Sequence, residues 1–408
     1  MRICLLTEYF NPNGAGGTPT MLPALMHEIK ALFPTAHIDI ITSRNIYRGD
    51  DITKYEAREC WHDMTVYRMN TPSSNRDSTA LRVLIGFWFS LQALIRLLTL
   101  PRYDLLFVGT NPPAAPWAAL ILKRLRRTPY VYLIHDLFPD VGVAVGALRG
   151  DSRVVKLAHR MQQSWLHGAS RVVVIGRDMR EHLVSHYLLP AKNVVTIPNW
   201  ADPDAVMPLD KATSFRAKHG LHGFVVLYSG NLGEHHDFDV ILDTARILQS
   251  TQQQVTFVFV GEGAKKEYLA ARISEEKLNN VRLFPFVPSE DFADLLASAD
   301  VSLVTLSQGV EGMGVPSKFY NILASGRPTI ALVAAKSEVA YVLGEERCGI
   351  RVDLHDIPAL VSAISLLFDD APLAAQMGRM AREALERRYT ITTSAKLFFR
   401  TFEEAIAS

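Results

Sequence analysis

The sequence predicts an α/β protein with two domains, each built around a parallel sheet. Short apolar runs alternate with segments of helical periodicity, as they do in chains of βαβ units. A turn-rich segment, residues 198–208, interrupts this alternation near the middle of the chain, as a connection between domains would. A chain of 408 residues with 48% hydrophobic content is long enough to bury two such cores.

The first half of the chain contains the predicted strands of one sheet. Its apolar runs cover residues 3–6, 38–41, 105–108, 130–133 and 172–175. Apolar residues recur at helical spacing over 21–32, which predicts a helix directly after the glycine-rich loop 13–18. Because that loop follows a strand, we expect it at the carboxyl edge of the sheet, where open α/β sheets bind ligands.

The glycine spacing in this loop differs from the G-x-G-x-x-G of dinucleotide-binding proteins, so NAD is a weak candidate ligand. We predict a substrate loop instead, with Gly16, Gly17 and Thr18 facing the ligand.

The alternation resumes in the second half of the chain, which predicts a second sheet with helices between its strands. The apolar runs cover residues 225–228, 255–260, 281–284, 301–306 and 329–333, and helices are expected at 238–248 and 291–297. The two halves share no visible sequence repeat, so their similarity is one of architecture.

Charge and cysteine content exclude several classes of protein. Lysine and arginine number 43 against 42 acidic residues, so no net positive field favours nucleic acid as a partner. The three cysteines, Cys4, Cys60 and Cys348, are far apart, which disfavours a disulfide framework or a zinc site. The apolar run near Met1 is too short for a signal-peptide core, and we expect a cytoplasmic protein.

Residues 81–100 form the most apolar segment, but Arg82, Gln92 and Arg96 interrupt it, which argues against a membrane-spanning helix. Its aromatic residues and the basic run 123–127 are typical of a helix that lies on a membrane surface. A buried domain helix with a solvated basic end is the alternative.

The segment 311–328 combines a glycine-rich turn, a predicted helix start and a lysine. Gly312 and Gly314 allow backbone N–H groups to approach a ligand, and Lys318 brings a full positive charge to the start of the helix. This pattern favours a site for the diphosphate of a substrate. An ordinary connection between a strand and a helix would have a similar sequence.

Asp202-Pro203-Asp204 has the D-x-D form that holds a divalent metal in other sugar-transferring folds. Here it lies in the predicted linker, where Asp and Pro are common turn residues, so we predict no metal site.

Together these motifs resemble glycosyltransferase family 4, a family of retaining enzymes with the GT-B fold. The resemblance rests on Ser229-Gly-Asn-Leu-Gly233, Val260-Gly-Glu-Gly263 and residues 311–326, which stand in the family's order over nearly the whole chain. The segments 134–140 and 197–200 are similar to those of bacterial enzymes that build surface polysaccharide or O-antigen units, of the fucosamine and colanic-acid type. That branch often acts on lipid-linked acceptors.

The resemblance implies two Rossmann-like domains facing a central cleft. It places an acceptor-binding domain at 1–200, a nucleotide-sugar-binding domain at 201–384 and a C-terminal helix at 385–408 that packs back on the first domain. Domain closure is the expected conformational step.

The resemblance also assigns roles to individual residues. Lys318 would stabilise the charge that grows on the β-phosphate, while Glu311 and His135 would hold the donor sugar. The other implied donor-binding residues are Asn231, Gly233, His236, Gly261, Glu262, Phe286, Gly312, Met313, Gly314, Val315, Pro316, Ser317 and Asn321. Asp136 would join the acceptor-side loop, although His135 and Asp136 could instead form a buried polar pair.

The implied partners are a nucleotide-diphosphate sugar, with UDP favoured over GDP, a lipid-linked saccharide acceptor and the inner face of the plasma membrane. The nucleotide-sugar is a substrate, so no cofactor or metal is implied.

Three positions depart from the family's pattern. Asn231 stands where an arginine is usual, His236 where a lysine is usual, and Asn321 where a glutamate commonly holds the ribose. The diphosphate therefore meets less fixed charge. Two other functions stay open: a nucleotide-sugar epimerase or hydrolase of the same fold, and a non-catalytic nucleotide-sugar-binding protein.

Overall fold

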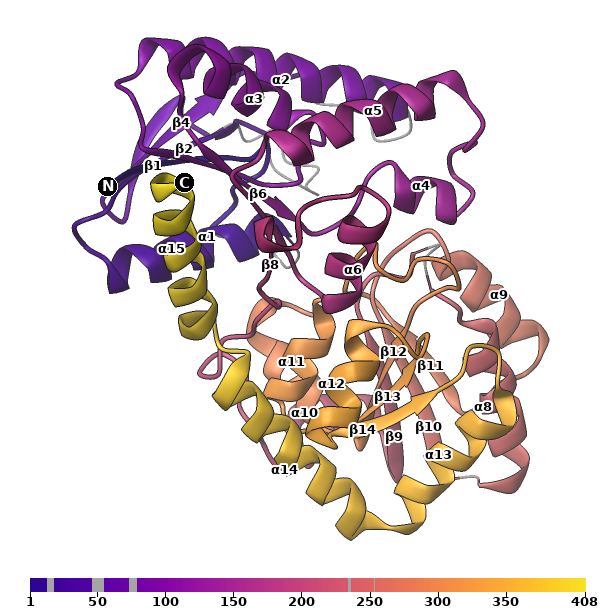
Figure 1. The fold of residues 1–408 in the computed structure, drawn as a ribbon. Coiled ribbons are helices and arrows are strands. Elements are labelled where there is room, and N and C mark those ends of the chain that lie inside the picture. Colours follow the sequence, from indigo (N-terminus) through magenta and orange to yellow (C-terminus); the bar gives the residue numbers. More distant parts are fainter. Residues whose placement is uncertain (13–17, 46–54, 73–78, 234–235, 253) are drawn as a thin grey trace. The chain divides into compact units, whose positions relative to one another are not determined.

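A computed structural model of the chain describes residues 1–12, 18–45, 55–72, 79–233, 236–252 and 254–408. The chain folds into two compact units (Figure 1). The first comprises Met1–Pro198 together with Ile391–Ser408, and the second comprises Asn199–Thr390. The chain therefore passes from one unit to the other between residues 198 and 199 and between residues 390 and 391. The predicted boundaries were at 200/201 and 384/385.

The first unit is built around an eight-stranded sheet in the order β3-β4-β2-β1-β5-β6-β7-β8. Its neighbouring strands pair in parallel except β3 and β4, which form an antiparallel hairpin. The central strands are buried on both faces, which explains their continuous apolar runs. The strands are β1 (Arg2–Leu6), β2 (His37–Ser43), β3 (Arg58–Trp61), β4 (Met64–Met69), β5 (Leu105–Val108), β6 (Tyr130–Ile134), β7 (Arg171–Val174) and β8 (Val194–Thr196).

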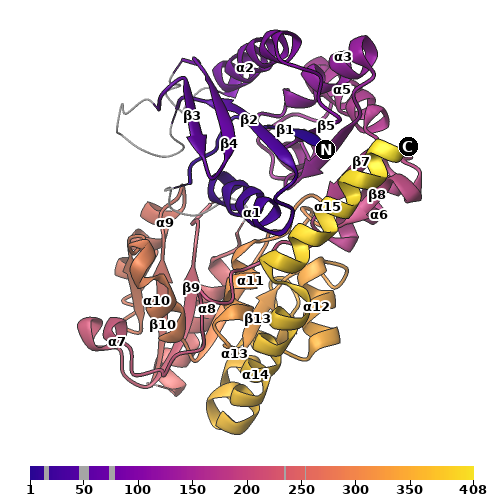
Figure 2. The same cartoon turned by 90° about the vertical axis from the view of Figure 1, so that its left-hand side faces the viewer.

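Helices cover this sheet, and one of them comes from the C-terminal end of the chain. They are α1 (Thr18–Leu32), α2 (Thr79–Thr99), α3 (Ala115–Arg126), α4 (Asp140–Ala144), α5 (Arg153–Gly168), α6 (Arg177–Ser185) and α15 (Ile391–Ala407), with a short 3-10 helix η1 (Ala191–Asn193). Figure 2 shows α15 beside α1, where the rings of Phe33 and Phe399 stack with centroids 3.6 Å apart. Phe398 and Phe402 of α15 are fully buried and pack near Phe107 of β5.

Helix α2 has one buried and one exposed apolar face. Phe89, Ala93 and Leu97 face the core, whereas Leu84 and Trp88 are 66% and 50% exposed. Its segment Leu81–Thr99 is long and apolar enough to cross a membrane, and 39% of it is buried inside this structure. One apolar face of the helix is therefore buried in the unit, and a second apolar face is exposed to solvent.

The second unit contains a six-stranded, fully parallel sheet in the order β11-β10-β9-β12-β13-β14. Its strands are β9 (Phe224–Ser229), β10 (Val255–Val260), β11 (Val281–Phe284), β12 (Val301–Thr305), β13 (Thr329–Leu332) and β14 (Gly349–Val352). Its helices are α7 (Ser214–His219), α8 (Asp239–Thr251), α9 (Lys266–Glu275), α10 (Phe292–Ala297), α11 (Lys318–Ala324), α12 (Glu338–Glu346), α13 (Ile357–Asp369) and α14 (Ala371–Arg388), with the 3-10 helix η2 (Ser289–Asp291).

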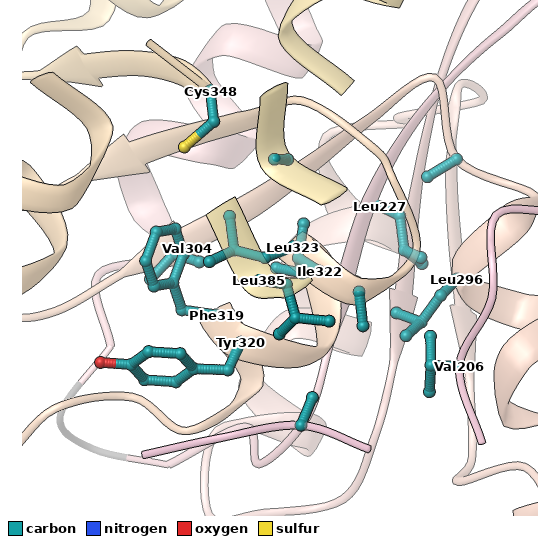
Figure 3. Packing of buried hydrophobic residues seen from close by; sticks show 14 of the residues in the cluster. Val206, Leu227, Leu296, Val304, Phe319, Tyr320, Ile322, Leu323, Cys348 and Leu385 are labelled. Carbon is teal, nitrogen blue, oxygen red and sulfur yellow. The ribbon is translucent and has the colours of Figure 1, made fainter. Parts of the chain in front are cut away.

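Two hydrophobic clusters cover the two faces of this sheet, since alternate residues of β9 belong to different clusters. Figure 3 shows the first cluster, in which Phe319 and Leu323 of α11 gather with Leu385 of α14 and Val304 of β12. This packing fixes the helix that begins at Lys318 against the sheet.

The structure confirms the predicted architecture of two parallel-sheet α/β units. Each strand predicted from an apolar run has a counterpart, but β3, β4, β8 and β14 were not predicted, because they are short or rich in polar residues. The predicted C-terminal helix is interrupted at Tyr389 and Thr390, so its first residues belong to α14 and the second unit. In the linker, Asp202 Oδ1 accepts hydrogen bonds from the N–H groups of Asp204 and Ala205, as in a turn.

Candidate functional site

The residues predicted to bind the donor in the second unit follow the carboxyl ends of neighbouring strands. Phe286 comes after β11, Gly261 and Glu262 after β10, Asn231 and Gly233 after β9, and the segment containing Glu311 and Lys318 after β12. Because these strands are parallel and adjacent, the residues lie along one edge of the sheet. This edge is where open α/β sheets bind ligands.

The turns after β9 and β10 are joined by backbone hydrogen bonds. The Leu232 N–H donates to the Glu262 carbonyl at 2.8 Å, and the Lys265 N–H donates to the Leu232 carbonyl at 2.9 Å. A Cβ on Gly261 would lie 1.9 Å from the carbonyl oxygen of Gly230, so any side chain there would force the turns apart. The glycines thus allow the two turns to pack closely.

Lys318 directs its ammonium group toward the turn after β9. A Cβ added to Gly230 would lie 3.0 Å from its Nζ, and the nitrogen is 3.6 Å from the centroid of the Tyr228 ring. Nζ is buried and has no hydrogen-bond partner among the described residues. Burial lowers the pKa of Lys318 well below its ordinary value. Tyr228 was not among the predicted site residues.

His236 is buried beside this turn, with Nδ1 2.6 Å from the Thr305 carbonyl oxygen. A carbonyl can only accept, so Nδ1 carries the hydrogen of this bond. The ammonium of Lys265 in turn donates to the His236 carbonyl at 2.8 Å. Lys265 is therefore a second positive group near the predicted phosphate site. It was not predicted, because nothing in the sequence just before α9 distinguishes it from a surface lysine.

The segment from Glu311 to Asn321 is half-buried apart from Gly312, Phe319 and Tyr320. Gly312 has a φ of 73°, and the turn closes with the Met313 N–H donating to the Val310 carbonyl. Gly314, Val315, Pro316 and Ser317 lead from this turn into α11, which begins at Lys318, whereas Pro316 and Ser317 had been expected in its first turn. Asn321 lies one turn inside α11 and accepts a hydrogen bond from the Ser325 N–H through its backbone.

In the first unit, His135 follows β6 directly. Its N–H donates to Thr110 Oγ1 at 2.8 Å, which in turn donates to the Leu133 carbonyl at 2.9 Å. The side chain is 5% exposed, and burial lowers its pKa to about 4, so the imidazole is neutral near pH 7. Asp136 is exposed, and the two residues do not form a buried pair.

Asp140 fixes the end of the loop that starts at His135. Its Oδ2 accepts a hydrogen bond from the Tyr187 hydroxyl at 2.5 Å, and its Oδ1 lies 3.5 Å from His182 Nε2. Burial alone would raise the pKa of Asp140, but the contacts with His182, Tyr187 and His159 hold it below its ordinary value. The carboxylate therefore links the 135–140 loop to α5 and α6.

Glu8 is a further acidic group, at the carboxyl edge of the sheet in the first unit, and it was not among the predicted site residues. It is 8% exposed just after β1, and its N–H donates to the Asn111 carbonyl at 2.7 Å. Burial raises its pKa to about 7. An acidic residue two positions after a buried strand was the available sequence signal. Of the predicted substrate loop, Gly16 and Gly17 lie outside the described residues, and Thr18 is the first residue of α1.

Comparison with known proteins gives two family matches that together span most of the chain. Residues 16–200 match the glycosyl transferase 4-like domain, and residues 211–384 match the glycosyl transferases group 1. The chain is 28% identical over 333 residues to "Probable glycosyltransferase WbjE" of Pseudomonas aeruginosa, covering 80% of this chain and 81% of the relative.

It is also 27% identical over 332 residues to "Putative colanic acid biosynthesis glycosyl transferase WcaI" of Escherichia coli K12, covering 79% and 80% of the two chains. Among solved structures it is similar to HepE of Anabaena in complex with UDP, with a TM-score of 0.73 and 17% identity over 99% of this chain and 100% of that one.

Proposed function

The chain belongs to glycosyltransferase family 4 and has its GT-B fold, and from this premise we propose that it transfers a sugar from a nucleotide-diphosphate sugar with retention of configuration. UDP is the favoured nucleotide. The acceptor is a lipid-linked or free saccharide, and the product is a cell-surface polysaccharide.

The observation that carries this proposal is the ammonium group of Lys318. It is buried and lacks a hydrogen-bond partner among the described residues, beside the two closely packed glycine turns at this edge of the sheet. A buried ammonium is costly unless an anion or another negative group meets it. The diphosphate of the donor would supply that anion, and its charge would raise the pKa of Lys318 again.

The reaction proposed here depends on positioning and charge. Lys318 stabilises the leaving phosphate, and Glu311 with the backbone of Gly312 and Gly314 holds the hydroxyls of the sugar. His135 contributes a neutral imidazole to the sugar, because its pKa of about 4 keeps it unprotonated. The departing phosphate accepts the acceptor's proton, so the proposal requires no enzyme nucleophile, metal or cofactor.

Two relatives support the finer parts of the proposal. The solved structure of HepE contains UDP, which favours UDP as the nucleotide. The printed name of WcaI concerns colanic acid biosynthesis, which favours a polysaccharide product.

The exposed face of α2 supports peripheral association with a membrane. Leu84, Trp88, Leu91, Ile95 and Leu98 recur at helical spacing and are all at least 38% exposed. Near the C-terminal end of this helix, the Arg126 guanidinium donates to the carbonyls of Leu97, Leu98 and Leu100.

Of the basic run 123–127, Lys123 and Arg126 bind backbone carbonyls, whereas Arg124 and Arg127 are exposed beside the exposed Leu125. An apolar stripe with neighbouring arginines fits an anionic lipid surface, and we place the enzyme at the inner face of the plasma membrane.

A donor panel tests this function. Purified protein receives UDP- and GDP-sugars with a membrane lipid extract, and both nucleotide release and label in the lipid fraction are followed. Labelling from one donor, lost in Lys318→Ala, is the expected result.

Two other results would contradict the proposal. Turnover of the nucleotide-sugar without any acceptor product would favour a hydrolase or epimerase. Tight nucleotide binding without turnover would favour a binding protein, with Asn231 and Asn321 as its distinguishing residues.

A further inference from the structure

The ammonium group of Lys318 rests on the face of an aromatic ring. Its Nζ lies 3.6 Å from the centroid of Tyr228, well inside the range at which a cation and a ring face attract each other. Lysine is the first residue of α11, whereas Tyr228 belongs to β9, so the contact joins two elements far apart in the sequence.

Among the described residues, the ring face of Tyr228 is a group that can attract the positive charge of this nitrogen. Nζ is buried without a hydrogen-bond partner among the described residues, and burial favours the neutral amine. The negative face of an aromatic ring acts in the opposite direction, because it attracts the charged form. A desolvated ammonium gains more from such a contact than an exposed one.

Tyr228 is itself held rigidly. Its ring packs edge-on against Phe238 with centroids 5.0 Å apart, and its hydroxyl donates to the Asn231 carbonyl at 2.8 Å. One side chain thus supports both the lysine and the turn that follows β9.

Gly230 completes the arrangement by leaving space for the lysine. Its φ is 142°, and a Cβ there would lie 3.0 Å from both Cε and Nζ of Lys318. The end of the lysine side chain therefore lies directly against the backbone of this turn.

We propose that Tyr228 is a positioning residue whose ring face holds the Lys318 ammonium below the Gly230–Gly233 turn, at the place where it meets the donor diphosphate. This inference rests on the proposed function, in which Lys318 binds that diphosphate. Tyr228 acts through the lysine and touches no reacting atom.

Substitutions at Tyr228 separate the ring from the hydroxyl. Tyr228→Phe keeps the ring and removes the hydrogen bond to Asn231, whereas Tyr228→Leu removes both. Binding of UDP and of GDP is measured by titration calorimetry for each variant, with Lys318→Ala alongside. We expect Tyr228→Phe to bind within about threefold of the unsubstituted protein and Tyr228→Leu about tenfold more weakly.

A series of fluorinated phenylalanines at position 228 tests the ring electrostatics with little change of shape. Each added fluorine withdraws negative charge from the ring face, so we expect nucleotide affinity to fall stepwise from Phe toward the Leu level. A purely structural role would leave affinity constant along this series. Tyr268→Leu, at an exposed tyrosine of α9, is the matched control and should bind as the unsubstituted protein does.

The outcomes distinguish this inference from the proposed function. Affinity lost in Lys318→Ala but unchanged across the fluorinated series would overturn the role of Tyr228 and leave the function standing. Equal weakening in Tyr228→Phe and Tyr228→Leu would assign the effect to the hydroxyl and also overturn it. An unsubstituted protein that binds neither UDP nor GDP would remove the proposed function, and the inference with it.

Discussion

The hydroxyl of Tyr187 donates a 2.5 Å hydrogen bond to Asp140, the residue that ends the loop beginning at His135. Both side chains are largely buried, with Tyr187 6% exposed as a residue and the Asp140 side chain 13% exposed. The 135–140 loop is thus held at its far end by a carboxylate in a protected environment.

Removal of this hydroxyl should destabilise the first unit. We expect Tyr187→Phe to lower the free energy of unfolding by about 1.5–3 kcal/mol, because a buried carboxylate loses a hydrogen bond. Urea unfolding measures the change. Tyr268→Phe removes a similar bond to the exposed Asp239, and its effect should stay below about 0.5 kcal/mol. Equal effects at the two sites would refute the protected environment of Asp140.

His135 should make the fold sensitive to acid. Its pKa falls from 6.5 to about 4 on folding, so the unfolded state binds more protons between these values and the free energy of unfolding rises with pH there. The contribution reaches about 3 kcal/mol above pH 6.5. We expect His135→Gln to flatten this part of the stability profile in urea titrations at several pH values. An unchanged slope would show that the imidazole is not desolvated.

Glu8 should have the opposite effect. Its pKa rises from 4.5 to about 7 on folding, so the folded state binds more protons in that window and stability is lost as pH rises through it. Relative to the unsubstituted protein, Glu8→Gln should gain up to about 3 kcal/mol of unfolding free energy between pH 4.5 and pH 8. Glu403→Gln, at an exposed position of α15, is the control and should show no such gain. A Glu8→Gln profile parallel to the original would contradict the burial of this carboxyl.

Gly230 should tolerate no side chain. An alanine there would need a strained φ of 142° and would crowd the Lys318 amine at 3.0 Å. We expect Gly230→Ala to cost about 1–3 kcal/mol of stability and to weaken nucleotide binding. The same change at Gly344, an exposed helical glycine of α12 with open space at its Cβ position, should be neutral or slightly stabilising. Denaturant unfolding and calorimetry give both values, and a harmless Gly230→Ala would show that the lysine can take another route.

The exposed face of α2 should bind lipid vesicles. Flotation with vesicles containing anionic lipid should recover the unsubstituted protein, and the pair Leu84→Ser and Trp88→Ser should reduce binding about tenfold or more. Arg124→Glu with Arg127→Glu should reduce binding mainly to anionic vesicles. Leu366→Ser, at an exposed position of α13, serves as the control. Binding that survives both pairs would place the membrane contact elsewhere on the chain, and an unsubstituted protein that does not float with vesicles would exclude it.

The sequence predicted the strands that are buried on both faces, because only apolar residues suit such positions. The hairpin β3-β4 was not predicted, because its strands contain charged residues. Arg58 of β3 is exposed, and Arg68 of β4 is buried because it forms an ion pair with Glu59. A charged residue that is buried through a distant partner leaves no local signal. The break between α14 and α15 was also missed, because Tyr389 and Thr390 are compatible with a helix in composition.

The candidate site was predictable where glycines and a lysine stand in one segment, as around Lys318. Tyr228 could not be predicted, because in sequence it is one of several aromatic residues in a strand, and its role depends on a contact with a residue of α11. His236 was predicted to bind the donor, but its hydrogen bond to the Thr305 carbonyl and its buried position could not be predicted. The positions of both side chains depend on contacts with residues far away in the sequence.

The return of α15 to the first unit bears on the order of events during synthesis. Residues 1–198 leave the ribosome first, but the surface around Phe33 and Phe107 is covered by residues 391–407, which are made only after the whole second unit. The N-terminal unit therefore cannot complete its core until residues 391–407 have been synthesised, whereas the unit Asn199–Thr390 is contiguous in sequence and needs no later segment. A nascent chain should thus keep the apolar surface around Phe33 and Phe107 uncovered throughout the synthesis of the entire second unit.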